Sequence, residues 1–85
     1  MTKREKDLIR LLSKPRDYRF AECKVLLERF GYKEIVKGKT SGSRVQFYRE
    51  LDKKTILLHK PHPKDIMKRY SIEDVIEKLK DNGDI

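Results

Sequence analysis

The stretch KGKTSGSRVQFYRELDKKTILLHKPHP, residues 37–63, decides the fold of this 85-residue chain. Apolar and polar residues alternate over 43–51, with Val45 and Phe47 on one side, and a second β-rich segment covers 55–59. Alternation with a period of two is typical of a strand that has one buried face. Because the two segments are separated by a short polar turn, the sequence predicts a β-hairpin.

Pairing across this hairpin is restricted, because the apolar residues of both strands must share one face. A tight turn at 52–53 meets that condition and predicts that Phe47 lies opposite Leu58. The same register predicts that Gln46 lies opposite His59. His59 is then expected on the face that points to solvent.

The solvent-facing side of the hairpin and its neighbouring loop predict a surface that contacts RNA. The residues expected to do so are basic, aromatic or polar: Lys37, Lys39, Ser43, Arg44, Gln46, Tyr48 and Lys60. Basic side chains can hold phosphates, and Tyr48 can stack on a base. A histidine on the same face can transfer a proton near neutral pH. A solvated strand face with no such role has a similar mixed polar composition, so both interpretations stay open here.

Two helices are predicted ahead of the hairpin. The pattern Thr-Lys-Arg-Glu that starts at Thr2 fits a capping box, and it predicts a helix over 3–13. Apolar residues at helical spacing predict a second helix over 20–30, with Gly31 at its C-terminal cap. Cys23 lies on that apolar stripe, so we expect a buried side chain and not a catalytic thiol.

One further strand and a closing helix complete the prediction. Residues 32–37 form the strand, with a weak pattern. Ser71 is expected to cap the last helix, whose apolar stripe begins at Ile72 and which ends before Gly83.

The charge of the chain points to an anionic partner. The net charge is +8, and it is uneven: residues 1–69 carry twenty Lys or Arg against nine Asp or Glu, whereas residues 70–85 carry two against five. A basic surface attracts polyanions through phosphate contacts and counterion release. Nucleic acid is therefore the leading class of partner.

Length and composition limit the other classes. A chain of 85 residues forms one domain with a modest core, so we expect a surface site and no cofactor. No apolar run approaches the roughly 20 residues that cross a bilayer, and the charged N-terminus lacks a secretory pattern. We therefore expect a cytoplasmic protein without a membrane segment.

The order of these features resembles the HicA toxins of bacterial toxin–antitoxin systems. The resemblance covers about residues 19–83, and its most specific parts are Gly42-Ser43 at the start of one strand and His62-Pro63 after the next. It implies an α+β fold like the double-stranded RNA-binding domain (dsRBD), in which helices pack on a three-stranded antiparallel sheet. It also implies an endoribonuclease that cleaves mRNA and is silenced by a HicB antitoxin. Residues 19–85 would form this domain and residues 1–18 an added N-terminal helix, which could pack on the domain or serve as an arm for a partner.

The chain departs from the family at one position that matters for catalysis. The catalytic histidine of the family directly follows the Gly-Ser pair, where this chain has Arg44. Arginine stays protonated in proteins, so Arg44 cannot act as a base, although it can stabilise the charge that develops on a phosphate. His59 is then the first candidate for acid–base catalysis and His62 the second. His59, His62 and Asp65 form a poor ligand set, so the expected mechanism is independent of metal.

Two other functions remain open at this point. A basic surface without the family histidine could bind RNA without cutting it. Alternatively, the basic face and a sheet edge could serve mainly to dock an acidic protein partner.

Overall fold

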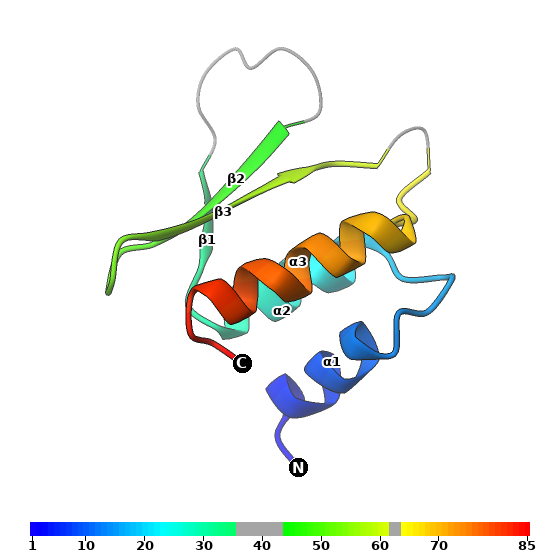
Figure 1. Cartoon of the computed structure of the whole chain (residues 1–85), viewed down its shortest axis with the longest axis horizontal. Helices are drawn as coiled ribbons and strands as arrows, with labels where there is room; N and C mark the ends of the chain where they lie inside the picture. The colour runs from blue at the N-terminus through cyan, green and yellow to red at the C-terminus, as the bar shows by residue number, and fades with distance from the viewer. Residues whose placement is uncertain (36–43, 62–63) are drawn as a thin grey trace.

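The computed structural model describes residues 1–35, 44–61 and 64–85, and Figure 1 shows these parts as three helices and three strands. Their order is α1 (Lys3–Leu12), α2 (Phe20–Arg29), β1 (Lys33–Ile35), β2 (Arg44–Arg49), β3 (Lys54–His59) and α3 (Arg69–Asp81). This is the predicted α+β architecture, with element bounds that differ from the prediction by a few residues. The predicted strand ends at 36–37 and 43 lie outside the described residues. Within the described parts, no helix combines the length and apolar composition that a membrane crossing needs.

The strands form one antiparallel sheet in the order β1-β2-β3. The predicted hairpin register is wrong by two residues, because Phe47 lies opposite Ile56 and not Leu58. A loop of four residues, 50–53, joins the strands in place of the expected tight turn at 52–53. A shift of two residues leaves every side chain on its original face, so the predicted division into a buried and an exposed face is correct.

The loop is longer than predicted because its own side chains stabilise it. Asp52 accepts hydrogen bonds from the Arg49 guanidinium, at 2.9 and 2.6 Å, and lies 3.4 Å from the backbone nitrogen of Lys54. Lys53 adopts a positive φ of 57°, which turns the chain into β3. These interactions close the hairpin at a position that apolar alternation alone could not identify.

Helices cover one side of the sheet. Helices α2 and α3 both pack against the sheet: α2 contacts β1, and α3 contacts β3 (Figure 1). Their apolar stripes and the inward residues of the hairpin make a single core, whose buried members are Leu11, Tyr18, Phe20, Cys23, Leu26, Leu27, Tyr32, Phe47, Ile56, Leu58, Met67, Ile72, Val75, Ile76 and Leu79. In the described parts of the chain, the opposite side of the sheet carries no helix.

Helix α1 packs on α2 and α3, on the side away from the sheet (Figure 1). Thr2 caps it as predicted, accepting a hydrogen bond from the backbone of Glu5 at 3.1 Å. Leu11 is fully buried in the core, and Arg29 of α2 donates to Asp7 at 2.7 Å. The N-terminal helix is therefore packed against the other two helices and is not an extended arm.

The start of α3 differs from the prediction. The helix begins at Arg69 with Lys68 at the N-cap, so Ser71 lies inside the first turn and is not the cap. The reason is tertiary: the backbone N–H of Met67 donates to the carbonyl of Tyr18 at 2.8 Å, and the Met67 side chain is buried. This contact fixes where the chain enters the helix and overrides the local capping preference of serine.

A cluster of hydrogen bonds ties the far end of β2 to the C-terminus. The Arg49 guanidinium donates to Asp84 at 2.7 Å and to the carbonyl of Phe30 at 3.0 Å, and it stacks over the Tyr32 ring at 4.4 Å from the centroid. Gly31 gives the space for this arrangement. Its φ is +96°, and a Cβ there would lie 3.2 Å from the Arg49 side chain.

Candidate nucleic-acid interface

The side of the sheet that no helix covers, among residues 1–35, 44–61 and 64–85, is formed by alternate residues of the three strands. We call it the open face; its residues in the described strands are Lys33, Ile35, Arg44, Gln46, Tyr48, Thr55, Leu57 and His59. Successive side chains of a strand point to opposite sides, so each of these residues alternates with one that faces the helices. The set combines two cations, a histidine and an aromatic ring with two aliphatic side chains.

Arg44 and His59 face each other directly across β2 and β3. Facing residues of an antiparallel pair have Cα atoms about 4.5–5.5 Å apart, so both side chains can reach one phosphate group. The predicted partner of His59 was Gln46, which instead lies opposite Leu57. The correction brings His59 nearer to Arg44 than the sequence had suggested.

Neither of these two side chains is used to hold the fold. Both are exposed, and neither makes a side-chain hydrogen bond or a salt bridge with another described residue. A polar side chain without protein partners is available to a ligand at no cost to internal bonding.

The remaining open-face residues form two rows across the sheet. Tyr48 lies between Lys33 and Thr55, and Gln46 lies between Ile35 and Leu57. The Tyr48 and Gln46 side chains are half-buried, whereas Leu57 is 47% exposed. An aromatic ring beside exposed aliphatic groups offers a flat apolar surface on which a base can stack.

The open face has a positive charge that the fold does not neutralise. Among the described strand residues the only carboxylate is Glu34, which pairs with Phe47 on the helix-covered side and forms a salt bridge to Lys24 at 3.1 Å. Lys33 and Arg44 form no salt bridge with a described residue. The helical layer is different, because there several cations are paired with carboxylates.

One such pair shows the contrast. Arg10 of α1 donates to Glu22 of α2 at 2.6 Å, and this hydrogen bond holds the pKa of the Glu22 carboxyl below its usual value. Lys14 likewise pairs with Glu73 of α3 at 3.0 Å and lowers the pKa of that carboxyl. These ion pairs tie α1 and the residues just after it to α2 and α3, whereas the described open-face charges have no such role.

The structure describes five of the nine predicted site residues. Lys37, Lys39, Ser43 and His62 lie outside the described residues. Lys60 is described, and it is exposed directly after β3, next to His59. The described part of the predicted site is therefore Arg44, Gln46, Tyr48, His59 and Lys60.

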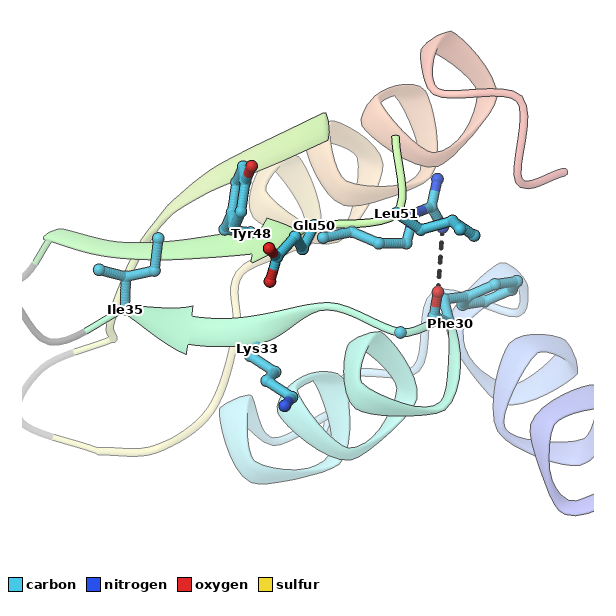
Figure 2. Close-up of a pocket in the computed structure, with 8 residues that line it drawn as sticks. Phe30, Lys33, Ile35, Tyr48, Glu50 and Leu51 are labelled. Carbon is cyan, nitrogen blue, oxygen red and sulfur yellow. Dashed lines mark hydrogen bonds between the residues drawn. The ribbon is translucent and has the colours of Figure 1, made fainter. Parts of the chain in front are cut away.

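The structure adds a feature that the sequence did not reveal. A hollow of about 410 Å³ lies where β1 and β2 run beside the loop after β2 (Figure 2). Its lining includes Lys33, Ile35 and Glu50, none of which was a predicted site residue, together with Tyr48. Knowledge of the β1–β2 register could have found Lys33, because that residue lies directly opposite Tyr48.

Cys23 is excluded from catalysis by its position. Its side chain is fully buried in α2, as predicted, and burial raises the pKa of the thiol to about 12. A thiol in that state is neither exposed nor ionised at neutral pH. In residues 1–35, 44–61 and 64–85, no three His, Cys, Asp or Glu side chains gather into a possible metal site.

The fold and the open face define a small α+β domain of the dsRBD-like kind, with a basic and aromatic sheet surface. A comparison with protein families identifies which group of such domains is involved. Residues 20–83 match the family described as the HicA toxin of bacterial toxin–antitoxin systems, so the chain belongs to that family. Searches of curated proteins and of solved structures gave no significant match. The matched range begins with α2, and α1 precedes it.

Proposed function

We propose that this toxin binds RNA on the open face and cleaves mRNA as a metal-independent endoribonuclease. The observation that carries the proposal is the direct pairing of Arg44 with His59 on an exposed, positively charged sheet surface. A histidine can act as the general base for transfer of a phosphoryl group within RNA, and a cation beside it can stabilise the charge that develops on the phosphate.

In this mechanism His59 takes the proton of a ribose 2′-hydroxyl. The 2′-oxygen then forms a bond to the adjacent phosphorus, the bond from phosphorus to the 5′-oxygen breaks, and that oxygen takes a proton from solvent. Arg44 stabilises the additional negative charge on the phosphate in the transition state, because a guanidinium can donate two parallel hydrogen bonds to it. The products are a 2′,3′-cyclic phosphate and a free 5′-hydroxyl. DNA lacks the nucleophile and is not cut.

Other parts of the proposal rest on sequence and on family membership. Lys37, Lys39, Ser43 and Lys60 extend the RNA contacts, and His62 is the second candidate for proton transfer. A HicB-like antitoxin is the proposed protein partner, and a site that acts on mRNA would be used in the cytoplasm. Residues 19–85 form the RNA-cleaving domain in this proposal, with 1–18 as an extension.

Cleavage of a long single-stranded RNA in EDTA, from mildly acidic to mildly alkaline pH, tests this function. His59→Ala should lower the rate by about 10²- to 10⁴-fold, the usual contribution of a general base. Arg44→Ala should lower it by about 10²-fold or more, and Arg44→Lys should recover part of that loss. Lys80→Ala is the control, because it removes one exposed cation from α3, outside the open face, and it should leave the rate unchanged.

Analysis of the cleavage products and a variant of His62 test the mechanism further. Fragments that end in a 2′,3′-cyclic phosphate are expected, and mass spectrometry detects them. If His62→Ala abolishes cleavage while His59→Ala does not, the base is misassigned. If the native protein binds the RNA and leaves it intact at every pH, the nuclease is disproved, and a non-catalytic RNA-binding role replaces it. If the protein binds an acidic partner protein and no RNA, the open face is a protein-docking surface.

A further inference from the structure

The hollow beside Tyr48 lies at the opposite end of the open face from Arg44 and His59. Figure 2 shows its labelled lining residues, which come from the end of α2, from β1, from β2 and from the loop that follows β2: Phe30, Lys33, Ile35, Tyr48, Glu50 and Leu51. All of them are described by the structure, and none faces the core except Phe30, which packs against its edge. A volume of about 410 Å³ is that of a small-molecule site, which is ordinarily about 300–1,000 Å³.

The apolar part of the lining suits a flat ring. Tyr48 and Ile35 are half-buried neighbours on adjacent strands, and the Leu51 side chain is 93% exposed. Figure 2 shows Tyr48 and Ile35 pointing the same way from adjacent strands, with Leu51 past the end of β2. A planar group that enters the hollow would contact the Tyr48 ring on one face.

The polar part of the lining is a cation and a carboxylate that do not pair with each other. Lys33 extends from the outer edge of β1, and the Glu50 carboxylate points from the end of β2 toward β1 (Figure 2); both residues line the hollow together with Tyr48. Neither makes a salt bridge with a described residue. The Arg49 guanidinium, which is also near the hollow, is fully occupied by Asp52 and Asp84 and so does not neutralise Glu50.

These groups match the parts of a nucleotide. An ionised carboxylate only accepts hydrogen bonds and can receive two parallel N–H donors. Guanine presents two such donors, N1–H and N2–H, on its Watson–Crick edge, whereas uracil presents one N–H between two carbonyl oxygens. A lysine at the rim of the site can hold the phosphate of the same nucleotide.

The site lies at a fixed distance from the cleavage centre. Tyr48 is four residues along β2 from Arg44, which corresponds to about 13 Å at 3.3 Å per residue. A single strand laid along β2 would therefore place one base in the hollow while a phosphate a few nucleotides away lies between Arg44 and His59.

We propose that the hollow is a nucleobase-binding site that selects guanine in single-stranded RNA, with Tyr48 stacking on the base, Glu50 accepting its N–H groups and Lys33 holding its phosphate. The inference rests on the proposed RNA-binding function and goes further, because it fixes which base is read and where it lies relative to the cut. RNA is favoured over a protein segment as the occupant, since the open face combines the Tyr48 ring with Lys33 and Arg44, neither of which forms a salt bridge with a described residue.

Binding of short oligonucleotides that cannot be cleaved tests the site separately from catalysis. The probes are 2′-O-methyl oligouridines of one length, with a single central guanosine, adenosine or cytidine or with none, each labelled for fluorescence anisotropy. The native protein should bind the guanosine probe about 5- to 100-fold more tightly than oligouridine, the usual range for one bidentate base contact. Glu50→Gln should abolish this preference and leave oligouridine affinity nearly unchanged, because the amide loses one acceptor but the stacking ring and Lys33 remain.

Two further variants separate stacking from hydrogen bonding. Tyr48→Ala should weaken all probes, whereas Tyr48→Phe should keep both affinity and preference. Glu77→Gln, the same chemical change as Glu50→Gln at an exposed carboxylate of α3 outside the open face and the lining, should have no effect. Circular dichroism of each variant checks that it is folded.

The results distinguish this inference from the function on which it rests. If the native protein binds every probe equally, or if Glu50→Gln keeps the preference for guanosine, the base site is disproved while the nuclease stands. If no probe binds and long RNA is neither bound nor cleaved, both proposals fail. If Tyr48→Ala and Glu50→Gln leave RNA binding intact but weaken binding to a HicB-like protein, the hollow holds a protein side chain and the inference is overturned.

Discussion

Arg44 and Arg49 begin and end the same strand, and the protein uses them in opposite ways. Arg49 faces the helices, has a side chain that is only 11% exposed, and donates to Asp52, Asp84 and the carbonyl of Phe30. Arg44 faces outward and makes no side-chain bond with a described residue. The residues are five apart, so strand alternation alone places them on opposite sides of the sheet.

The comparison shows that charge by itself does not identify a binding residue. Arg49 forms salt bridges with two carboxylates, those of Asp52 and Asp84, and the hydrogen bond to Asp52, above all, raises the pKa of its guanidinium. Arg44 lies opposite a histidine, where its charge is available to a phosphate. The first is a structural residue and the second is the candidate for function, and each of the predictions below tests that division.

The largest expected effect is on stability. Arg49→Ala leaves Asp84, which is itself only 9% exposed, without its cation, and it also removes the contact with the Tyr32 ring. Loss of one partner of a buried, hydrogen-bonded ion pair should cost about 2–4 kcal/mol of unfolding free energy. Arg44→Ala should change it by less than about 0.5 kcal/mol, as for most exposed positions. Urea unfolding of the three proteins measures both, and equal losses would contradict the division of roles.

The second prediction concerns RNA binding, for which Arg44 and not Arg49 should show the larger effect. Arg44→Ala should weaken RNA binding about tenfold and reduce the slope of log affinity against log salt by about 1, as expected for one lost phosphate contact. The control is Arg49→Lys, which keeps the charge inside the carboxylate cluster. Its salt slope should equal that of the native protein. If the slope changes in Arg49→Lys and not in Arg44→Ala, the phosphate contact lies at the Arg49 end of β2, and its assignment to Arg44 is wrong.

The face of each arginine could be predicted from sequence, but the partners could not. Alternation of Val45 and Phe47 with polar residues fixes which side of β2 is buried, and that prediction is confirmed. The register is not fixed by alternation, because a shift of two residues keeps both faces and only the turn distinguishes the possibilities. The four-residue loop depends on Asp52, which accepts a hydrogen bond from Arg49, and apolar alternation does not predict that bond.

Long-range contacts account for the other differences. The Arg49–Asp84 pair joins residues that are 35 apart in the sequence. The start of α3 is set by Met67 meeting Tyr18, so the local preference of Ser71 for a cap had no effect. The hollow beside Tyr48 depends on how β1 pairs with β2, and the weak pattern of 32–37 gave no register from which Lys33 could be placed.

A smaller difference in stability is expected between Tyr32, which is buried, and Tyr48, which lies on the open face, in parallel with the two arginines. Tyr32 is 1% exposed, and its hydroxyl donates to Asp84 at 2.6 Å and accepts from Asn82 at 2.9 Å. Burial, followed by the bond to Asp84, raises the pKa of this phenol to about 12. Tyr32→Phe should cost about 1–2 kcal/mol, because it removes a bond to a charged group. Tyr48→Phe, on the open face, should leave the unfolding free energy nearly unchanged in the same urea titration.

The smallest expected effect is on how the free energy of unfolding changes at acidic pH. The hydrogen bond from Arg49 lowers the pKa of the Asp52 carboxyl below its ordinary value of 3.8, so the folded protein binds fewer protons than the unfolded chain in that range. The stabilisation is therefore complete above the ordinary pKa and is lost as the pH falls through the lowered one. Asp52→Asn removes this titration, and its stability should fall less steeply below about pH 4 than that of the native protein.

Glu50→Gln is the matched control two residues away, because Glu50 forms no salt bridge with a described residue. Urea unfolding at a series of acidic pH values measures the three slopes. A slope that is shallower in Glu50→Gln and unchanged in Asp52→Asn would show that the acid sensitivity of this end of β2 does not arise from the Arg49 cluster.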